Sequence, residues 1–305
     1  MRIIKIWITA TFILTFLVII AGGVVRTTQS GMGCPDWPTC FGKWIPPLNA
    51  SQLPPDFEKY LQKQDIDHTF NVFHTWVEYF NRLLGALLGV FAVVQCVLLF
   101  FRRNFYRKAY KLSLLYLLTV MLTGLFGAMV VKLNLEHISI SIHLLLAIIL
   151  LQIQLGVLLA FQSQLFIIYV DNKIKKLLVG FLVILLIQAT LGTMVRMYID
   201  NVSKTLHYEQ RETWLADTPV SFLIHRSFSW LVLLSALFSG WYCRNIVAIR
   251  NKVFILIGII TLSMITGIIL FYADMPAIAQ PIHLLLASLA ITQTMLVLLQ
   301  TKSKT

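Results

Sequence analysis

The sequence predicts an all-α integral membrane protein whose transmembrane helices form two tandem four-helix bundles. Hydrophobic residues make up 58% of the 305 residues and charged residues only 12%, so the chain has more apolar surface than a soluble domain can bury. The apolar residues gather in runs long enough to cross a bilayer, which takes about 20 residues of helix. The hexapeptide Ile-His-Leu-Leu-Leu-Ala occurs twice, at 142–147 and 282–287, and indicates a duplicated unit.

Eight segments are apolar enough and long enough to be transmembrane helices. The connections between them are short, so the chain has no room for a separate soluble domain. The first segment is followed by Arg26-Thr27-Thr28-Gln29 rather than by a small-residue cleavage site, so we expect a retained helix and not a signal peptide. The expected ranges are 4–25, 72–101, 112–131, 138–162, 174–198, 220–243, 252–272 and 277–300.

The basic residues lie at both ends of the chain and on alternate connections. Cytoplasmic loops of membrane proteins carry an excess of Lys and Arg, so this distribution puts both termini in the cytoplasm. It also accounts for the net charge of +12 without a nucleic-acid partner. Because no Arg- and Ser-rich transit peptide precedes the first segment, we expect a multi-pass protein of a bacterial plasma membrane. The basic clusters are Arg2/Lys5, 102–111, 173–176, 244–252 and Lys302/Lys304.

Short motifs repeat in the same order in two halves of the chain, which we take as residues 1–165 and 166–305. With four helices in each half, both copies keep the same orientation in the membrane, so the repeat is parallel and not inverted. The matched pairs are Gly22–Arg26 with Gly192–Arg196, Asn81-Arg82 with His225-Arg226, Thr123-Gly124 with Thr266-Gly267, and His143 with His283.

His225 and His283 are expected at equal depth, near the outer edge of the hydrocarbon. Each is 19 residues from the basic residue at the inner end of its segment, which is roughly 30 Å of helix. Two facing imidazoles in a helical bundle suit the two axial positions of a haem iron. The alternative is one interfacial histidine on each helix, hydrogen-bonded to a neighbour. Arginines at the same edge could bind haem propionates; these are Arg26, Arg82, Arg196 and Arg226.

The first half repeats this site imperfectly. His143 is present, but Asn81 takes the place that His225 has in the second half. Glu78 lies one turn outward on the same helix face, and His74 lies a further turn out, ~10 Å beyond the level of His143. An iron with two strong ligands can only pass electrons, whereas one histidine beside a carboxylate is typical of a reactive site.

Glu78 and His74 each have a structural alternative. Glu78 could act as an acid or base, or it could form an ion pair with Arg82 at i+4. His74 could reach a haem only if its helix tilts or slides, and it could otherwise be a hydrated histidine at the membrane interface.

The long outer loop at 27–71 carries Cys34 and Cys40, with five residues between them. A disulfide is sterically possible, and the outer compartment permits it. A reducible thiol pair that handles electrons is the second interpretation. Cys96 and Cys243 fall inside apolar segments, where we expect them to serve packing.

These residues together resemble the haem A synthase family of membrane proteins over essentially the whole chain. The most specific piece is Gly31-Met32-Gly33-Cys34-Pro35-Asp36-Trp37-Pro38, and the others are Glu78-x-x-Asn81-Arg82, His143, His225-Arg226 and His283. The resemblance implies oxidation of the C8 methyl of haem O to a formyl group by successive hydroxylations, which gives the haem A of terminal oxidases. It also implies a b-type haem in the second half and the substrate haem in the first.

Residue roles follow from the same resemblance. It implies that His225 and His283 ligate haem b, that Glu78 is the acid needed for the oxidation, and that His143 ligates the substrate haem. The family has a histidine where this chain has Asn81, so either His74 replaces it or the iron is five-coordinate. The implied partners are haem O, membrane lipid, a quinone or similar electron acceptor and a haem O synthase, and a homo-oligomer is left open.

Two other functions compete with this one. A non-catalytic bis-histidine cytochrome exchanging electrons with quinone explains His225 and His283 but gives Glu78 and the outer cysteines no role. A transporter with a histidine proton relay needs polar residues along a path through the membrane. Here the polar residues are expected at the outer edge, which disfavours a transporter.

Overall fold

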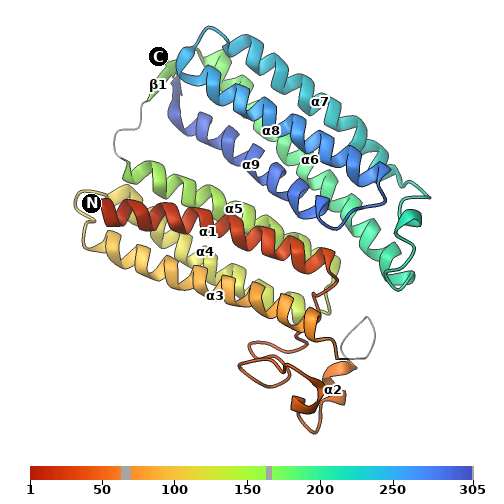
Figure 1. Cartoon of the computed structure of the whole chain (residues 1–305). Helices are drawn as coiled ribbons and strands as arrows, with labels where there is room; N and C mark the ends of the chain where they lie inside the picture. The colour runs from red at the N-terminus through yellow and green to blue at the C-terminus, as the bar shows by residue number, and fades with distance from the viewer. Residues whose placement is uncertain (63–69, 163–166, 304–305) are drawn as a thin grey trace. The chain divides into compact units, whose positions relative to one another are not determined.

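The computed structural model of the chain describes residues 1–62, 70–162 and 167–303 and is mostly helical (Figure 1). Within these residues, eight helices are long and apolar enough to cross a membrane, which confirms the eight predicted spans to within a few residues at most of their ends. They are α1 (Arg2–Thr27), α3 (Val72–Phe100), α4 (Arg107–Lys132), α5 (His137–Phe161), α6 (Asn172–Thr205), α7 (Val220–Cys243), α8 (Val247–Tyr272) and α9 (Ala279–Gln300).

Short elements lie between and after the long helices. The loop between α1 and α3 contains a 3₁₀ turn at Ala50–Gln52 and the single-turn helix α2 (Glu58–Leu61), and a second 3₁₀ turn at Arg211–Thr213 precedes α7. Two strands, β1 (Ile168–Val170) and β2 (Thr301–Ser303), pair in parallel. These strands were not expected from the sequence, because three residues are too few to show a periodicity.

The chain divides into two compact units, Met1–Ser163 and Gln164–Thr305. The expected boundary between residues 165 and 166 lies outside the described residues. The first unit contains α1, α3, α4 and α5, and the second contains α6, α7, α8 and α9.

Both units have the same internal arrangement of helices. In the first unit, α1 packs against α3 and α5, and α4 packs against the same two helices. In the second unit, α6 packs against α7 and α9, and α8 packs against the same two. Each unit is therefore a closed ring of four helices in chain order, which confirms the prediction of two four-helix bundles.

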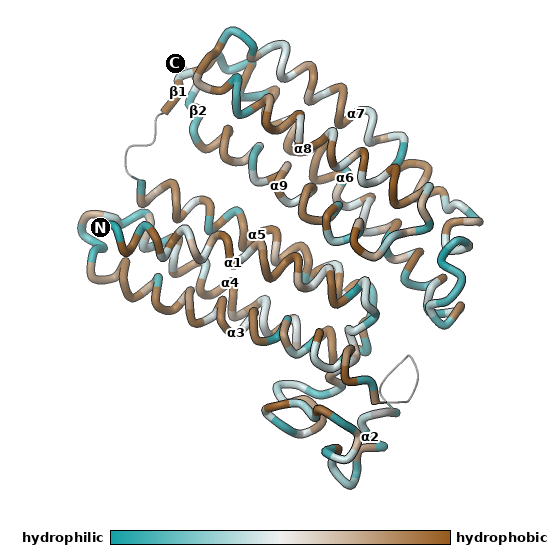
Figure 2. The backbone as a smooth tube through the Cα atoms, viewed as in Figure 1, coloured by the Kyte–Doolittle hydropathy of each residue, from teal (hydrophilic) through white to brown (hydrophobic). Residues whose placement is uncertain are grey.

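The basic segments of each unit lie at one end of that unit. One buried cluster joins the start of α1, the end of α3, the start of α4 and the end of α5. A second cluster joins the start of α6, the end of α7, the start of α8 and the end of α9. The basic connections that follow α3 and α7 therefore lie beside the basic start of each unit, and the helix middles are apolar (Figure 2).

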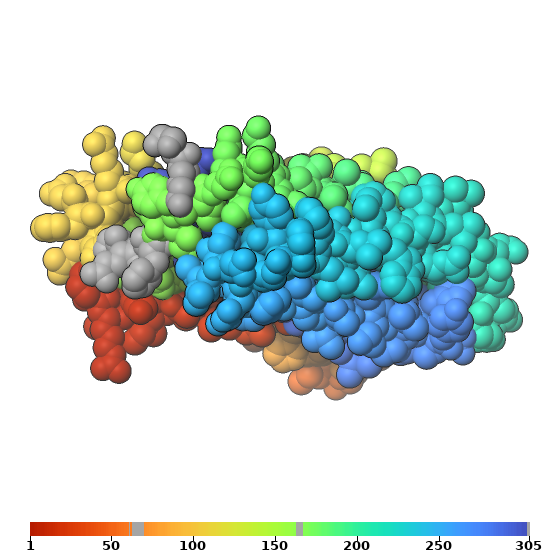
Figure 3. Space-filling model, turned by 90° about the horizontal axis from the view of Figure 1, so that it is seen from above, coloured from red at the N-terminus to blue at the C-terminus, as the bar shows by residue number. Residues whose placement is uncertain are grey.

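Large apolar side chains also cover the outside of the helices. Trp230, Leu234 and Trp241 on α7 are exposed, and residues of α7 and α8 form part of the surface seen in Figure 3. In water such a surface would drive aggregation, whereas the hydrocarbon of a bilayer is its natural solvent. The chain is therefore a multi-pass membrane protein.

Buried polar side chains lock the centre of the first unit. Gln95 on α3 and Gln154 on α5 exchange hydrogen bonds through their amide groups, at 2.7 and 2.9 Å. Gln154 also donates to the carbonyl of Ile8 on α1. The hydroxyls of Thr15 and Tyr116 lie 2.8 Å apart between α1 and α4. These bonds tie helices together where lipid offers no alternative partner.

Helices α4 and α8 begin five residues before the expected starts at 112 and 252, and the largest difference is at the end of α6. The expected span ended at residue 198, but α6 continues to Thr205 and has 34 residues. Residues 193–218 contain no Gly or Pro that would end the helix. Ile199 packs in a buried cluster with Trp214. A helix of this length spans about 50 Å, which exceeds the roughly 30 Å of hydrocarbon, so its last turns project beyond the bilayer.

Candidate functional site

The second unit brings together the two histidines that the sequence singled out. The ring centres of His225 on α7 and His283 on α9 lie 6.5 Å apart, with an angle of 72° between the ring planes. Two metal–nitrogen bonds of about 2 Å, plus the distance from each nitrogen to its ring centre, give a similar spacing of roughly 6 Å for imidazoles on opposite sides of one iron. The pair can therefore hold a haem iron.

A glycine on the neighbouring helix lies against each of these rings. A Cβ added to Gly192 on α6 would be 3.2 Å from Cε1 of His225, and one added to Gly267 on α8 would be 3.4 Å from Cε1 of His283. Both distances are tighter than, or at the limit of, ordinary contact, so the absence of a side chain lets each ring settle on a helix backbone. Within the described residues, Nδ1 of His225 is buried and has no hydrogen-bond partner.

The first unit repeats this packing at His143. A Cβ added to Gly127 on α4 would be 3.3 Å from Cε1 of His143 on α5. Gly127 precedes His143 by the same number of residues as Gly267 precedes His283. The matching of Thr123-Gly124 with Thr266-Gly267 is therefore wrong by one helical turn. A shared Thr-Gly dipeptide does not fix the register between two repeated helices, whereas the contact between a glycine and the histidine does.

The second imidazole of the first unit is missing, and the space beside its glycine stays open. Gly22 on α1 corresponds to Gly192, but a Cβ added to it would meet nothing within 4 Å. Asn81 stands where the second unit has His225. The Oδ1 atom of Asn81 is buried and has no hydrogen-bond partner within the described residues. The two units thus differ at the position of the second ligand.

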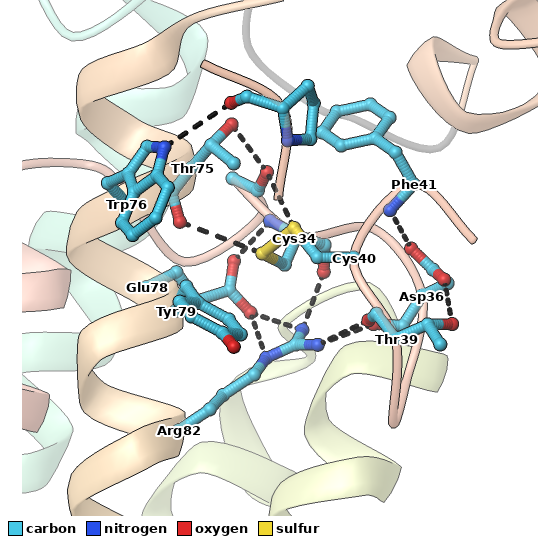
Figure 4. The surroundings of a disulfide bond; sticks show 12 residues. Cys34, Asp36, Thr39, Cys40, Phe41, Thr75, Trp76, Glu78, Tyr79 and Arg82 are labelled. Carbon is cyan, nitrogen blue, oxygen red and sulfur yellow. Dashed lines mark hydrogen bonds and ion pairs between the residues drawn. A yellow bond between two sulfur atoms is a disulfide. The ribbon is translucent and has the colours of Figure 1, made fainter. Parts of the chain in front are cut away.

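The outer loop of the first unit is folded around a disulfide between Cys34 and Cys40 (Figure 4). The disulfide prediction is confirmed, and both cysteines are buried. The carboxylate of Asp36 accepts hydrogen bonds from the backbone N–H of Phe41 and of Gly42, and from the hydroxyl of Thr39. Together with the disulfide, these bonds fold residues 34–42 into a compact unit, which we call the disulfide lobe.

Arg82 on α3 fastens this lobe to the helix with all five of its N–H donors. Nη1 donates to the carbonyls of Asp36 and Thr39, and Nη2 donates to the carbonyl of Cys34. Nη2 and Nε also donate to Oε1 of Glu78. Because no donor of Arg82 is left over in this arrangement, we do not propose it as a propionate ligand. The sequence did not reveal this role, since backbone carbonyls carry no residue signature.

Glu78 is buried between the helix and the lobe, with only 4% of its surface exposed. Its Oε1 accepts from Arg82, at 3.1 Å from Nε, and its Oε2 accepts from the backbone N–H of Cys34 at 2.6 Å. The ion pair with Arg82 that the i+4 spacing predicted is therefore present. These three donors hold the carboxylate directly against the disulfide lobe.

Gly33 makes the closest approach of the lobe to α3. An added Cβ would be 2.3 Å from the carbonyl oxygen of His74 and 2.7 Å from the backbone nitrogen of Thr75, which no side chain can tolerate. The hydroxyl of Thr75 donates to the carbonyl of Gly33. Further out, Trp76 and Tyr79 donate to loop carbonyls. The start of α3 is thus the docking surface for the whole loop.

His74 lies in the first turn of α3, where Asn71 caps the helix by accepting from the backbone N–H of His74. The ring of His74 is half-buried and lies edge to face against Phe73. His74 is therefore beside the docked loop, one turn outward from Glu78.

The three other arginines lie at helix ends near these sites. Arg26 is in the last turn of α1. Arg196 on α6 pairs with Asp200 at 3.4 Å. Arg226 follows His225 on α7, is exposed, and lies over the ring of Phe222.

Fold and site together define a class of protein: a membrane protein made of two four-helix units. One unit has a facing pair of histidines, and the other has one glycine-backed histidine, His143, and a disulfide-bonded outer lobe. The chain matches the family described as cytochrome oxidase assembly protein, COX15-CtaA, over residues 5–295. That match covers nearly the whole chain, so the protein belongs to this family.

Several curated relatives are named Heme A synthase. The protein from Orientia tsutsugamushi strain Boryong is 27% identical over 161 residues, which are 48% of this chain and 45% of the relative. The one from Beijerinckia indica is 32% identical over 160 residues, 48% of this chain and 44% of the relative. The one from Shewanella oneidensis is 30% identical over 135 residues, 44% of this chain and 38% of the relative. The match thus spans less than half the length of these relatives.

Replacing Gly33 by Ala should lift the lobe from α3, because the new Cβ would overlap the carbonyl of His74. We expect faster reduction of the Cys34–Cys40 disulfide by an added thiol, by about tenfold for every 1.4 kcal/mol of docking free energy lost. Alkylation followed by mass spectrometry measures that rate. Gly85→Ala on the same helix is the control, since its Cβ would meet nothing within 4 Å. Equal rates in the Gly33 variant and the wild type would contradict the docking role.

Proposed function

We propose that the protein is a haem A synthase, which oxidises the C8 methyl of haem O to a formyl group by successive hydroxylations and so supplies haem A to terminal oxidases. The observation that supports this most directly is the asymmetric duplication. One unit has a facing pair of histidines, whereas the other keeps only His143 of that pair and carries the carboxylate of Glu78 one turn from Asn81. Membership of a cytochrome oxidase assembly family agrees with it.

In this proposal the second unit holds a b-type haem between His225 and His283. A bound haem of this kind would supply a one-electron carrier with no open position for other chemistry. The protein's own contribution is to hold the two rings on Gly192 and Gly267 at the spacing an iron requires. Arg226, exposed next to His225, and Arg196 are the candidates for its propionates.

The first unit takes haem O as its substrate, with His143 as a ligand of the substrate iron. Asn81 replaces the second imidazole, and the space beside Gly22 is open, so we propose that the second axial position of the substrate is not filled by a strong protein ligand. That is the condition for a reactive iron rather than a saturated one.

Glu78 is the proposed acid–base group. Converting a methyl to a formyl group adds one oxygen atom, taken from water in this proposal, and releases electrons to the acceptor and protons to a base, so a proton acceptor has to lie near the substrate. Arg82 and the N–H of Cys34 hold the carboxylate of Glu78 in place, and the ionised carboxylate is the form able to accept a proton. His74, one turn outward, is placed to pass that proton to the outer surface.

The remaining proposals concern the surroundings of the enzyme. The basic end of each unit faces the cytoplasm by the positive-inside rule, which puts Glu78, the disulfide lobe and the histidines near the outer face of a bacterial plasma membrane. We propose a haem O synthase as the source of substrate and an electron acceptor such as quinone as the partners of this reaction.

A bis-histidine cytochrome is the second candidate. The observation in its favour is that Glu78 is fully engaged in holding the lobe, which gives the carboxylate a structural role without any catalysis. On that account the first unit would be a degenerate copy, and the histidine pair alone would carry the function.

Haem analysis tests the proposed function. The chain is expressed together with a haem O supply in cells that lack their own haem A synthase, and the haems are extracted with acidified acetone and separated by chromatography. We expect haem A or its hydroxylated intermediate in addition to haem B. Haem B with unconverted haem O would contradict the enzyme and favour the cytochrome.

Glu78→Gln keeps the shape of the side chain and an acceptor for the N–H of Cys34 but removes the charge. We expect haem A formation to fall by about 100-fold or more while haem B stays bound, measured by the same extraction. The alkylation rate of Cys34 and Cys40 serves as the control for a displaced lobe. Wild-type amounts of haem A would refute the catalytic role of Glu78, and loss of haem B would refute the assignment of two separate sites.

A further inference from the structure

Thr266 on α8 contacts the ring of His283 on α9. Its hydroxyl oxygen lies 2.9 Å from Nδ1 of His283. The same hydroxyl donates to the carbonyl of Ser263 at 2.8 Å. A hydroxyl has a single proton, so Thr266 has none left to donate to His283. It therefore accepts a hydrogen bond from Nδ1–H of His283.

This bond fixes the tautomer of His283. With the proton on Nδ1, the lone pair of the neutral ring is on Nε2, and only a lone pair can bind a metal. A hydrogen bond from the other ring nitrogen to a fixed acceptor orients a metal-bound imidazole and makes it a stronger base. Thr266 is thus the kind of partner that a ligating histidine needs.

The threonine behind His283 has no counterpart at the matching position of the first unit. Nδ1 of His225 has no hydrogen-bond partner within the described residues. In the first unit the residue before the contacting glycine is Phe126 rather than a threonine, and phenylalanine cannot accept a hydrogen bond from a ring N–H in the plane of the imidazole. The duplicated histidines therefore share the glycine contact but not the threonine.

We propose that Thr266 is a positioning residue for the electron-carrying haem: it holds His283 in the tautomer that binds iron through Nε2 and raises the electron donation of that ring. This inference rests on the proposed haem site between His225 and His283. A stronger donor stabilises ferric iron, so Thr266 lowers the reduction potential of the bound haem.

Thr266→Val tests the proposal, because valine keeps the branched shape and loses the hydroxyl. In the purified full chain with its haem, we expect the midpoint potential to rise and the affinity for haem b to fall by about 10–100-fold. Thr266→Ser restores the hydroxyl and should return both values to those of the wild type. Thr261→Val on the same helix is the matched control, since its exposed hydroxyl bonds only to the carbonyl of Ile257.

Redox titration followed by absorbance, and haem transfer to an apoprotein acceptor, give the two readouts. A wild-type potential and wild-type haem retention in Thr266→Val would overturn the role of Thr266 while leaving the haem site intact. A wild-type chain without a bis-imidazole spectrum would overturn the haem site and the role of Thr266 with it. A shifted potential that the serine variant fails to restore would also count against the hydrogen bond as the cause.

Discussion

The architecture depends on one packing contact, an imidazole ring set directly against a glycine of the neighbouring helix. It occurs for His143 on Gly127, His225 on Gly192 and His283 on Gly267. In each case a Cβ added to the glycine would lie 3.2–3.4 Å from Cε1 of the ring, which is a tight contact. An ionisable ring inside a transmembrane bundle is costly unless it has a partner. Glycine lets the ring sit deep between helices without displacing them, where two such rings can meet around a flat ligand. The ring of four helices in each unit provides the frame for this contact.

The duplication gives the chain two copies of one histidine site, and the two copies differ in their ligand residues. An ancestral unit with two glycine-backed histidines would bind an iron with no free position. The second unit keeps that arrangement and adds Thr266 behind one ring. In the first unit Asn81 stands for one histidine, and the disulfide lobe docks on the same helix through Glu78 and Arg82. On the proposed function, Asn81 in place of a histidine and Glu78 one turn away distinguish the reactive copy of the site from the electron-carrying copy.

Much of this could be predicted from the sequence, for identifiable physical reasons. The eight helices followed from apolar length, and the His225–His283 pair followed from equal depth on two helices of one repeat. The role of Arg82 could not be predicted, because its targets are backbone carbonyls of a loop. The bond from His283 to Thr266 could not be predicted from the shared Thr-Gly dipeptides, because they suggest a register one turn away from the true one. The spacing between each histidine and its glycine pairs Gly127 with Gly267, and it shows that Thr266 corresponds to Phe126.

The most direct test of the account is electron paramagnetic resonance of the ferric protein loaded with haem at both sites. The account predicts one low-spin signal from the bis-imidazole site of His225 and His283, and one high-spin signal from the site of His143. Asn81→His should convert the second signal to low spin, since the open space beside Gly22 can receive the ring. Two low-spin signals in the wild-type protein would contradict the account, because they would show that another strong ligand, such as His74, completes the first site.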